Sequence, residues 1–528
     1  MNTAPDDLEQ SLNIDRALWM HAFNYSMINF DSYVGYAQNY YLYHGDNGQF
    51  NPIIWDLNQS FGSYRLTDAS TLWAGFSILE AKNADPLQHF SNFSITPRPL
   101  MTILFENETY RKMYLAHLKT IMEENFNDAD YLERASAIQS IIETDVLNDP
   151  NKFYSNADFY INIDTTVSDL IDYVGLRDLM ENRAIYLSTY PGMSDEPTII
   201  NTTDLELEYN LGETITFTAE LTDVNEVFFY YRFLSTDAFT QLLMNDEGVN
   251  GDVLADDGIY SVDLEKASNQ IDFYFYAQNE IAGKFSPQRA AYEFYSLSSE
   301  LQPGDLVINE FVAKNLYDYT DEYGELEDWV ELYNNSDAPI STKGLFITDT
   351  IGDLFKSEVG DMLLPANSYK IFWADEDYVD YLSHWDFKLN EDGEQIILST
   401  AEGTILDSVS FGHQSSIFSY GRYPNGTGDF TEMFSTIQYE NQAPNDTVFH
   451  ADFHAFPIPA RGVLYVNTSY EAPYTLTFTN SVGQTIKQIE VAWAGLVEVD
   501  VSNMSDGLYI ITIERDDFTI SKKIIVTD

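Results

Sequence analysis

The sequence predicts a multidomain α+β protein in which a helical region of about 190 residues is followed by three β-sandwich modules. The chain has 528 residues, which is enough for several separate cores at roughly 100–200 residues per domain. Apolar residues recur at helical spacing only in the first part. From about residue 198 onward, short alternating segments typical of strands dominate. A hydrophobic content of 44% and an aromatic content of 15% exclude a disordered chain.

The first helix is expected to start at Asn13. After it, Leu18, Ala22 and other apolar residues recur at helical spacing and form one helical face. Further helices are expected over 100–122, 131–142 and 167–187. The aromatic runs 39–43 and 53–55 are separated by a turn sequence with Asp46, Asn47 and Gly48, which predicts a β-hairpin.

Turn-forming sequences divide the chain into four parts. TYPGMSDEPT ends the helical region, and SSELQPGD separates the first two β-modules. The strand patterns after these linkers, such as VFFYYRF, DWVELYN and LYIITIE, have lengths suited to sandwiches. The expected domains are 1–192, 197–299, 304–447 and 452–528.

The charge excludes several classes of partner. With 26 Lys+Arg and 85 Asp+Glu, the formal net charge is −59, which repels nucleic acid and anionic lipid. The chain has no cysteine, so disulfides, thiolate metal sites and cysteine nucleophiles are excluded. No run approaches the roughly 18 apolar residues of a transmembrane helix, and the first residues lack the pattern of a signal peptide. No zinc-protease, nucleophile-elbow or P-loop motif is present.

One group of polar residues in the helical region suits phosphoryl transfer. Asp31 follows the first helix, Asn39 opens the expected hairpin and Asp56 closes it. Phosphoryl transfer needs a carboxylate near the acceptor hydroxyl, and carboxylate and amide oxygens to hold Mg²⁺ on the phosphates. On spacing alone these residues could equally be a turn cap, a backbone partner and a solvated loop residue.

The same stretch resembles the CotH-like family of atypical, spore-coat protein kinases. The resemblance rests on Asn29-Phe30-Asp31-Ser32, on the NYYLY and WDLNQSFG sequences that flank the hairpin turn, and on RPLMTILFENETYRKMYLAHL from Arg98. It implies that Asp31 is the catalytic aspartate. It also implies that Asp56 and Asn39 bind Mg²⁺, which in turn holds the ATP.

The resemblance covers only the C-terminal half of such a kinase. About 30 residues precede Asp31, and they leave no room for a lobe with the lysine and acidic partner that hold the nucleotide. The kinase is therefore expected to be truncated, and this chain alone is expected not to turn over ATP.

A second acidic group lies in NDEGVNGDVLADDGIY. Asp246, Asn250, Asp252 and Asp257 offer oxygen ligands on a glycine-rich turn, which suits Ca²⁺. The alternative is an acidic hairpin connection within a β-sandwich.

Residues from about 306 to 446 resemble the lamin-tail domain, an immunoglobulin-like sandwich. The resemblance rests on VINEFVAKN, EDWVELYNNSDAPISTKGLFITD, LPANSYKIFWADED and SYGRYPNGTGDF. It implies binding or spacing without catalysis. Trp329 and Leu332 are expected in the core, and the acidic stretch 317–327 is expected to be a solvated loop.

The C-terminal segment resembles the sorting domain of type IX secretion substrates. FPIPARGVLYV, FTNSVGQTIKQ, DGLYIITIE and the terminal KKIIV carry the resemblance. It implies export across the outer membrane by the type IX machinery, followed by release or attachment at the cell surface. The alternative is a further small sandwich without this role.

Together these patterns predict an exported cell-surface protein with a CotH-like module, using Mg²⁺ and ATP if it is active and Ca²⁺ if the acidic loop binds it. The expected partners are cell-surface or extracellular proteins or polysaccharides. The rival hypothesis is a non-catalytic surface adhesin or scaffold in which Asp31 and Asp56 are relics of a kinase.

Overall fold

The structure is a computed structural model of the whole chain. It describes residues 8–67, 75–88, 98–127, 129–169, 171–316, 318–376, 383–416, 418–442, 453–468, 473–492, 495–515 and 518–527. The chain forms two compact units. Unit 1 comprises residues 1–209, 214–265 and 270–298, and unit 2 comprises 210–213, 266–269 and 299–528.

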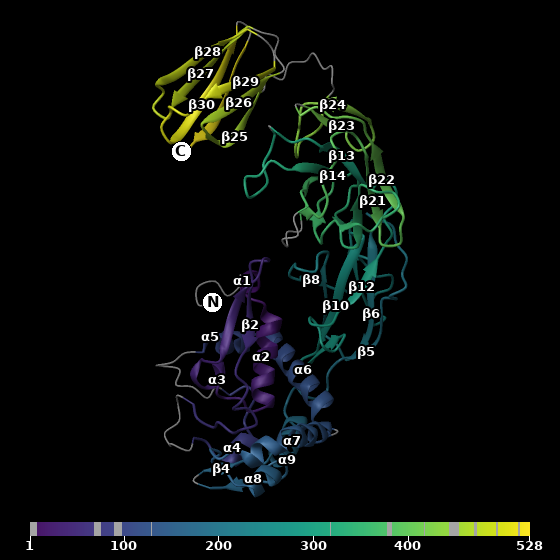
Figure 1. Cartoon of the computed structure of the whole chain (residues 1–528). Helices are drawn as coiled ribbons and strands as arrows, with labels where there is room; N and C mark the ends of the chain where they lie inside the picture. Colours follow the sequence, from purple (N-terminus) through teal and green to yellow (C-terminus); the bar gives the residue numbers. More distant parts are fainter. Residues whose placement is uncertain are drawn as a thin grey trace. The chain divides into compact units, whose positions relative to one another are not determined.

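The described helices all belong to unit 1 and precede its sandwich (Figure 1). They are α1 Leu8–Ser11, α2 Ile14–Ser26, α3 Tyr33–Tyr36, α4 Ile78–Lys82, α5 Pro99–Glu106, α6 Glu108–Asn125, α7 Asp130–Asn148, α8 Asn156–Ile161 and α9 Leu176–Ser188. In the described part of the chain, no helix combines the length and the apolar character that a bilayer crossing requires.

The expected helix over 100–122 is two helices. The side chain of Asn107 accepts a hydrogen bond from the backbone N–H of Tyr110 at 3.1 Å, and this cap starts α6 immediately after α5 ends. An asparagine that caps a new helix competes with continuation of the old one. The apolar spacing continues across the break, which is why it did not reveal the interruption.

The expected helix over 167–187 is wrong in its first half. The short strands β3 Val167–Ser168 and β4 Asp172–Tyr173 pair there, and α9 begins only after Gly175. A Cβ on Gly175 would lie 2.5 Å from the carbonyl carbon of Thr165, so the chain is folded back too closely for a helix. Val167, in β3, therefore belongs to a tight hairpin and not to a helical face.

The expected hairpin is present as β1 Tyr40–His44 and β2 Phe50–Ile54, which pair antiparallel. Two hydrogen bonds attach its second strand to the start of α2: Arg16 Nε donates to the Pro52 carbonyl at 2.8 Å, and Asn13 Nδ2 donates to Asn51 Oδ1 at 3.0 Å. These bonds fix the hairpin to the start of the first long helix.

Two sheets complete unit 1 (Figure 1). Their strands are β5 Thr198–Thr202, β6 Ile215–Thr222 and β9 Ile259–Leu264 in one sheet, and β7 Glu226–Arg232, β8 Thr240–Leu243, β10 Gln270–Gln278, β11 Gly283–Ser286 and β12 Tyr295–Ser298 in the other. Phe217 of the first sheet stacks on Phe229 of the second with ring centroids 4.3 Å apart, so the sheets form a sandwich.

The helices and the five-stranded sheet of unit 1 share one hydrophobic core. The fully buried imidazole of His117 on α6 stacks between Trp19 of α2, at 4.1 Å, and Phe285 of β11, at 4.6 Å. His117 Nε2 lies 2.7 Å from Asp15 Oδ1, and the other oxygen of Asp15 accepts the backbone N–H of Ala291 at 3.1 Å. Helices and sheet are thus joined by packing and by hydrogen bonds.

Unit 2 contains the remaining strands (Figure 1). A six-stranded sheet has the order β20 His384–Trp385, β19 Tyr369–Ala374, β14 Asp328–Asn334, β13 Leu306–Val312, β23 Ser419–Tyr423 and β24 Asp429–Met433. A four-stranded sheet has the order β17 Ser357–Glu358, β16 Leu345–Thr348, β21 Gln395–Thr400 and β22 Ile405–Ser410, and β15 Ile340–Ser341 pairs with β18 Leu363–Leu364. Trp329 and Leu332 are fully buried, as the sequence predicted.

The last strands of unit 2 form a seven-stranded sheet with a core of its own. Its order is β28 Thr485–Val491, β27 Tyr474–Asn480, β30 Gly507–Arg515, β31 Phe518–Val526, β25 Phe453–Arg461, β26 Val463–Thr468 and β29 Gly495–Asp500. The architecture of helices followed by β-sandwich modules is therefore the predicted fold class.

The neighbouring strands β13 and β14 each carry a buried carboxyl group. Glu310 and Glu331 are opposite each other in register, and neither is exposed to solvent. Glu310 accepts hydrogen bonds from the backbone N–H of Thr436 at 3.0 Å and from its hydroxyl at 2.6 Å. Burial, with the neighbouring Glu331 charge, raises the pKa of Glu310 to about 8, and burial raises the pKa of Glu331 to about 7.

Replacing His117 with alanine should destabilise unit 1. The substitution removes both ring contacts and leaves Asp15 without its imidazole partner, so we expect a loss on the order of 3 kcal/mol in the free energy of unfolding. Chemical denaturation with tryptophan fluorescence measures it. His44→Ala, at an exposed hairpin position, is the matched control. A loss for His117→Ala no larger than that of the control would contradict a shared core.

Glu310→Gln should remove part of the pH dependence of unit 2. Because the folded pKa of Glu310 lies near 8, above its ordinary value of 4.5, its stabilising effect is complete below pH 4.5 and is lost as the pH rises toward 8. A glutamine at this position would imitate the protonated acid, so it should change Tm little at acid pH and raise it at alkaline pH. The shift from 4.5 to about 8 is about 3.5 units, and at about 1.4 kcal/mol per unit it corresponds to a gain of at most about 5 kcal/mol in the free energy of unfolding at alkaline pH.

Thermal unfolding across this pH range tests the prediction. Glu432→Gln, at an exposed position of β24, should leave the wild-type pH profile unchanged. An identical pH profile for wild type and Glu310→Gln would show that the buried carboxyl does not titrate as described.

Candidate functional site

The three residues predicted for phosphoryl transfer lie at the open end of the β1–β2 hairpin. Asn39 Nδ2 donates to the backbone carbonyl of Asp31 at 2.8 Å, and the backbone N–H of Trp55 donates to the Asn39 carbonyl at 3.1 Å. The two chain segments that carry Asp31 and Asp56 therefore meet at Asn39. Asp31 and Asn39 are half-buried, and Asp56 is exposed.

The backbone around this hairpin is unusually strained. Ile28, Ala37, Asn39, Asp56 and Phe61 all have φ between +48° and +57°, in the left-handed region that non-glycine residues seldom adopt. A β-branched residue such as Ile28 is particularly unfavourable there. Such conformations cost of order 1–3 kcal/mol each and concentrate at functional sites.

Two neighbours of Asp31 were not predicted from the sequence. Gln38 donates its side-chain amide to Asp31 Oδ1. Tyr64 lies near enough that burial, together with the charges of Tyr36 and Asp31, raises its pKa to about 12. Gln38 precedes Asn39 and could have been noticed on that ground, whereas Tyr64 has no sequence signal because the fold alone brings it to Asp31.

The arginines next to the hairpin are already engaged. Arg16 donates to the carbonyl of Pro52, Arg65 donates to the carbonyls of Gly62, Phe76 and Asp172, and Arg98 donates to those of Tyr33 and Gly35. Arg65 and Arg98 are buried. Arg65 and Arg98 therefore hold the backbone of the site in place and do not offer a charge to phosphate oxygens, whereas Arg16 is exposed and is bonded through Nε to Pro52, in the middle of β2.

The donor set at the hairpin fits a hard cation such as Mg²⁺. Oxygen atoms of Asp31, Asp56 and Asn39 are the ligand chemistry that Mg²⁺ prefers, and it keeps several of its waters when bound to one or two carboxylates. The Asp56 side chain is exposed to solvent.

The outer surface of the hairpin is aromatic. Tyr41, Tyr43 and Trp55 are exposed by 55%, 58% and 57%, and the rings of Tyr41 and Trp55 meet edge to face at 5.5 Å. Exposed apolar patches of this kind mark interaction surfaces more often than scattered single residues do.

Three of the four residues predicted to bind Ca²⁺ come together on the loop between β8 and β9. Carboxylate oxygens of Asp246, Asp252 and Asp257 lie within 4.8 Å of one another. Asp246 also accepts the backbone N–H groups of Asp257, at 3.1 Å, and Gly258, at 3.0 Å. Asn250 lies on the same loop with an exposed side chain and a left-handed backbone.

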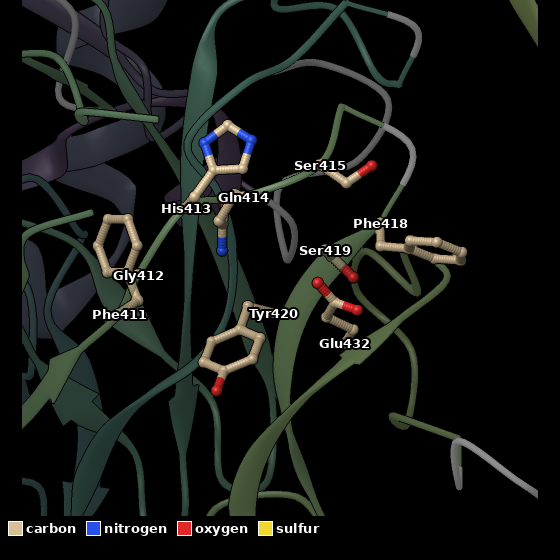
Figure 2. Close-up of a pocket in the computed structure, with 9 residues that line it drawn as sticks. All are labelled: Phe411, Gly412, His413, Gln414, Ser415, Phe418, Ser419, Tyr420 and Glu432. Atoms are coloured by element: carbon tan, nitrogen blue, oxygen red, sulfur yellow. The ribbon is translucent and has the colours of Figure 1, made fainter. Parts of the chain in front are cut away.

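A cavity of about 270 Å³ lies in unit 2 beside β23 and β24 (Figure 2). Glu432 of β24 is opposite Tyr420 of β23 in register, and Figure 2 shows both residues among those that line the cavity. The buried side chain of Gln414 accepts the backbone N–H of Ala313 at 2.7 Å. The remaining lining residues are Phe411, Gly412, His413, Ser415 and Phe418.

The sequence matches three family models. Residues 2–180 match the CotH kinase protein, residues 300–413 match the lamin tail domain, and residues 454–527 match the secretion system C-terminal sorting domain. The chain carries these three modules in that order. The sorting domain marks it for export to the cell surface through the secretion machinery.

The lamin tail match ends before the sheet does. Strands β23 and β24, beyond residue 413, complete the six-stranded sheet, and Thr436 and Gln438 still bind the buried carboxylates of Glu310 and Glu331. The segment up to about residue 441 is therefore packed with this module.

Comparison with curated proteins finds no match. Among solved structures, a variant of titin domains I67–I69 is similar over 63% of this chain and 99% of its own, at 11% identity and a TM-score of 0.15. Extracellular domains 3–5 of Drosophila OTK are similar over 63% and 98%, at 10% identity and a TM-score of 0.21.

Proposed function

We propose that this chain is an exported surface protein whose CotH module supplies one half of a phosphoryl-transfer site, the half that activates a hydroxyl and holds Mg²⁺. The observation that carries the proposal is the convergence of the Asp31 and Asp56 segments on Asn39, within a backbone held in strained conformations. Solvated loop residues without a role would not need to be kept in such conformations.

Asp31 is the residue suited to the acceptor hydroxyl. Its carboxylate is half-buried and is oriented by the Gln38 amide on one oxygen, which leaves the second oxygen to accept the hydroxyl proton. Asp56 and Asn39 would hold Mg²⁺. The ion would supply neutralisation of charge on the phosphates.

The other half of the site, a cation that binds the phosphates, is not supplied by the arginines around the hairpin. Arg65 and Arg98 are buried and bonded to backbone carbonyls, and Arg16 is bonded to the Pro52 carbonyl in the middle of β2, away from the open end of the hairpin. Without such a charge the transferred phosphoryl group is poorly stabilised. We therefore expect nucleotide binding through the metal without turnover by this chain alone.

The second candidate function is a non-catalytic adhesin or scaffold. The exposed aromatic side chains of Tyr41, Tyr43 and Trp55 favour it, because they suit contact with an extracellular protein or polysaccharide. In that case the polar residues at the hairpin would bind no nucleotide.

Binding of a fluorescent ATP analogue, with Mg²⁺ and with EDTA, separates the two functions. We expect Mg²⁺-dependent binding that Asp56→Ala weakens at least about tenfold, since it removes the carboxylate ligand. Asp46→Ala is the matched control, because it removes a carboxylate at the other end of the same hairpin. Equal affinities for all three proteins would contradict the proposed site and favour the scaffold.

Wild type and Asp31→Ala, incubated with radiolabelled ATP and a serine-containing substrate, should both transfer no label to the substrate. Label that Asp31→Ala abolishes would show that the chain holds a complete kinase site, and the argument from the engaged arginines would then fail.

We also propose that the loop of Asp246, Asp252 and Asp257 binds Ca²⁺. Three carboxylates, backbone carbonyls and water can provide the six to eight oxygen ligands that Ca²⁺ takes.

Calorimetric titration of the full chain with Ca²⁺ should show a binding site, and Asp252→Asn should weaken its affinity for Ca²⁺ at least about tenfold. Asp204→Asn is the control, because it removes a carboxylate at an exposed position of the same unit. It should bind Ca²⁺ as wild type does. Equal Ca²⁺ binding by wild type and Asp252→Asn would refute the site.

A further inference from the structure

A buried histidine in unit 2 is held between carboxylates from two different segments. His384 Nδ1 forms a hydrogen bond with Asp375 Oδ2, and His384 Nε2 lies 3.1 Å from Glu322 Oε1. The side chains of His384 and Asp375 are only 3% and 4% exposed. An imidazole with a carboxylate on one nitrogen and a second acid at the other has the arrangement of metal-binding histidines.

Asp321 completes the group. It lies in the acidic stretch that the sequence predicted to be solvated, yet it is only 8% exposed, so that expectation is wrong for this residue. Its Oδ1 accepts the backbone N–H groups of Tyr323 and Glu325 at 2.9 and 2.8 Å, which turns the loop inward. Ligand atoms of Asp321, Asp375 and His384 all lie within 4.8 Å of one another.

The sheet holds these residues in fixed positions. Asp375 directly follows β19, and His384 begins β20, which pairs with β19 in parallel. Asp321 and Glu322 lie on the connection between β13 and β14. A site that draws its residues from strand ends and one ordered loop is better fixed than one on a single flexible loop.

The local charge is strongly unbalanced. Asp321, Glu322 and Asp375 surround a single imidazole, and the nearby Lys388 is already paired with Glu327 at 3.0 Å. One imidazolium can neutralise only one of the three carboxylates. Glu322 is 45% exposed, but Asp321 and Asp375 are buried, and burying two carboxylates beside one imidazole is costly unless another cation compensates their charge.

We propose that Asp321, Asp375 and His384 bind a first-row divalent transition metal ion such as Zn²⁺, with Glu322 orienting the imidazole through Nε2. A mixed set of imidazole and carboxylate ligands suits Zn²⁺, whereas Ca²⁺ takes oxygen ligands alone. The ion would tie the acidic loop to the edge of the six-stranded sheet. The proposal does not depend on the phosphoryl-transfer function, whose residues lie in the other unit.

Zn²⁺ must displace a proton from the imidazole. Burial acts to lower the pKa of His384, but hydrogen bonds and the charges of Asp375 and Glu322 outweigh it, so its pKa is raised. Binding is therefore best measured at mildly alkaline pH, where the proton competes least.

The test uses the full chain, freed of metal with EDTA and titrated with Zn²⁺ in a calorimeter. We expect wild type to bind Zn²⁺ at this site and His384→Gln and Asp321→Asn to weaken that binding at least about tenfold. His413→Gln is the matched control, because His413 also lies beside an aspartate, Asp392, at 3.3 Å, but is exposed. The control should bind Zn²⁺ as wild type does.

Co²⁺ absorption provides a second readout that does not rest on affinity alone. Wild type and His413→Gln should give the visible d–d bands of a low-symmetry protein site, and His384→Gln should not. Circular dichroism establishes that each variant is folded, and Asp321→Asn keeps the proposal testable if His384→Gln does not fold. Equal Zn²⁺ binding by wild type, His384→Gln and Asp321→Asn, or no binding by wild type, would overturn the proposal and leave the group as a histidine ion pair.

Discussion

The packing of His117 between Trp19 and Phe285 is the interaction on which the arrangement of unit 1 depends. It joins α2, α6 and β11, and Asp15 adds hydrogen bonds to the imidazole and to the backbone of Ala291. Because α2 in turn binds the β1–β2 hairpin through Arg16 and Asn13, the position of the candidate site is set by the same core. The helical module and the first sandwich therefore form one structural body, although the sequence between them contains a strong linker signal.

The three proposed cation sites differ in the types of their polar groups and in how deeply these groups are buried. At the hairpin, two carboxylates and an amide sit at a half-exposed edge, and the neighbouring arginines are used to hold the backbone. On the loop between β8 and β9, the ligands are all oxygens and partly exposed. Around His384, an imidazole is buried among acids. Ligand type and burial thus favour different cations at these proposed sites, although all belong to one very acidic chain.

The buried Glu310–Glu331 pair shows how a surplus of acid can also serve structure. Both carboxylates accept hydrogen bonds from the segment that contains Thr436 and Gln438, so they fasten the chain that follows β24 to the sheet. The strand pattern of DWVELYN did not predict that Glu331 is buried. A polar residue in an alternating strand normally faces water, and only the covering segment, which lies 107 residues further along the chain, reverses this.

The amino-acid sequence determined the fold class, the order of the modules and the hairpin, because local spacing and short motifs report on structure within a few tens of residues. It also singled out Asp31, Asn39 and Asp56 as candidates for phosphoryl transfer. It also placed Asp246, Asp252 and Asp257 on one loop. The tertiary structure decided what distant segments do to one another: the break at Asn107, the hairpin before Gly175, the approach of Tyr64 to Asp31, and the meeting of Asp321 with His384. Such contacts join residues that no local pattern relates, and they arise only when a common core forces the segments together.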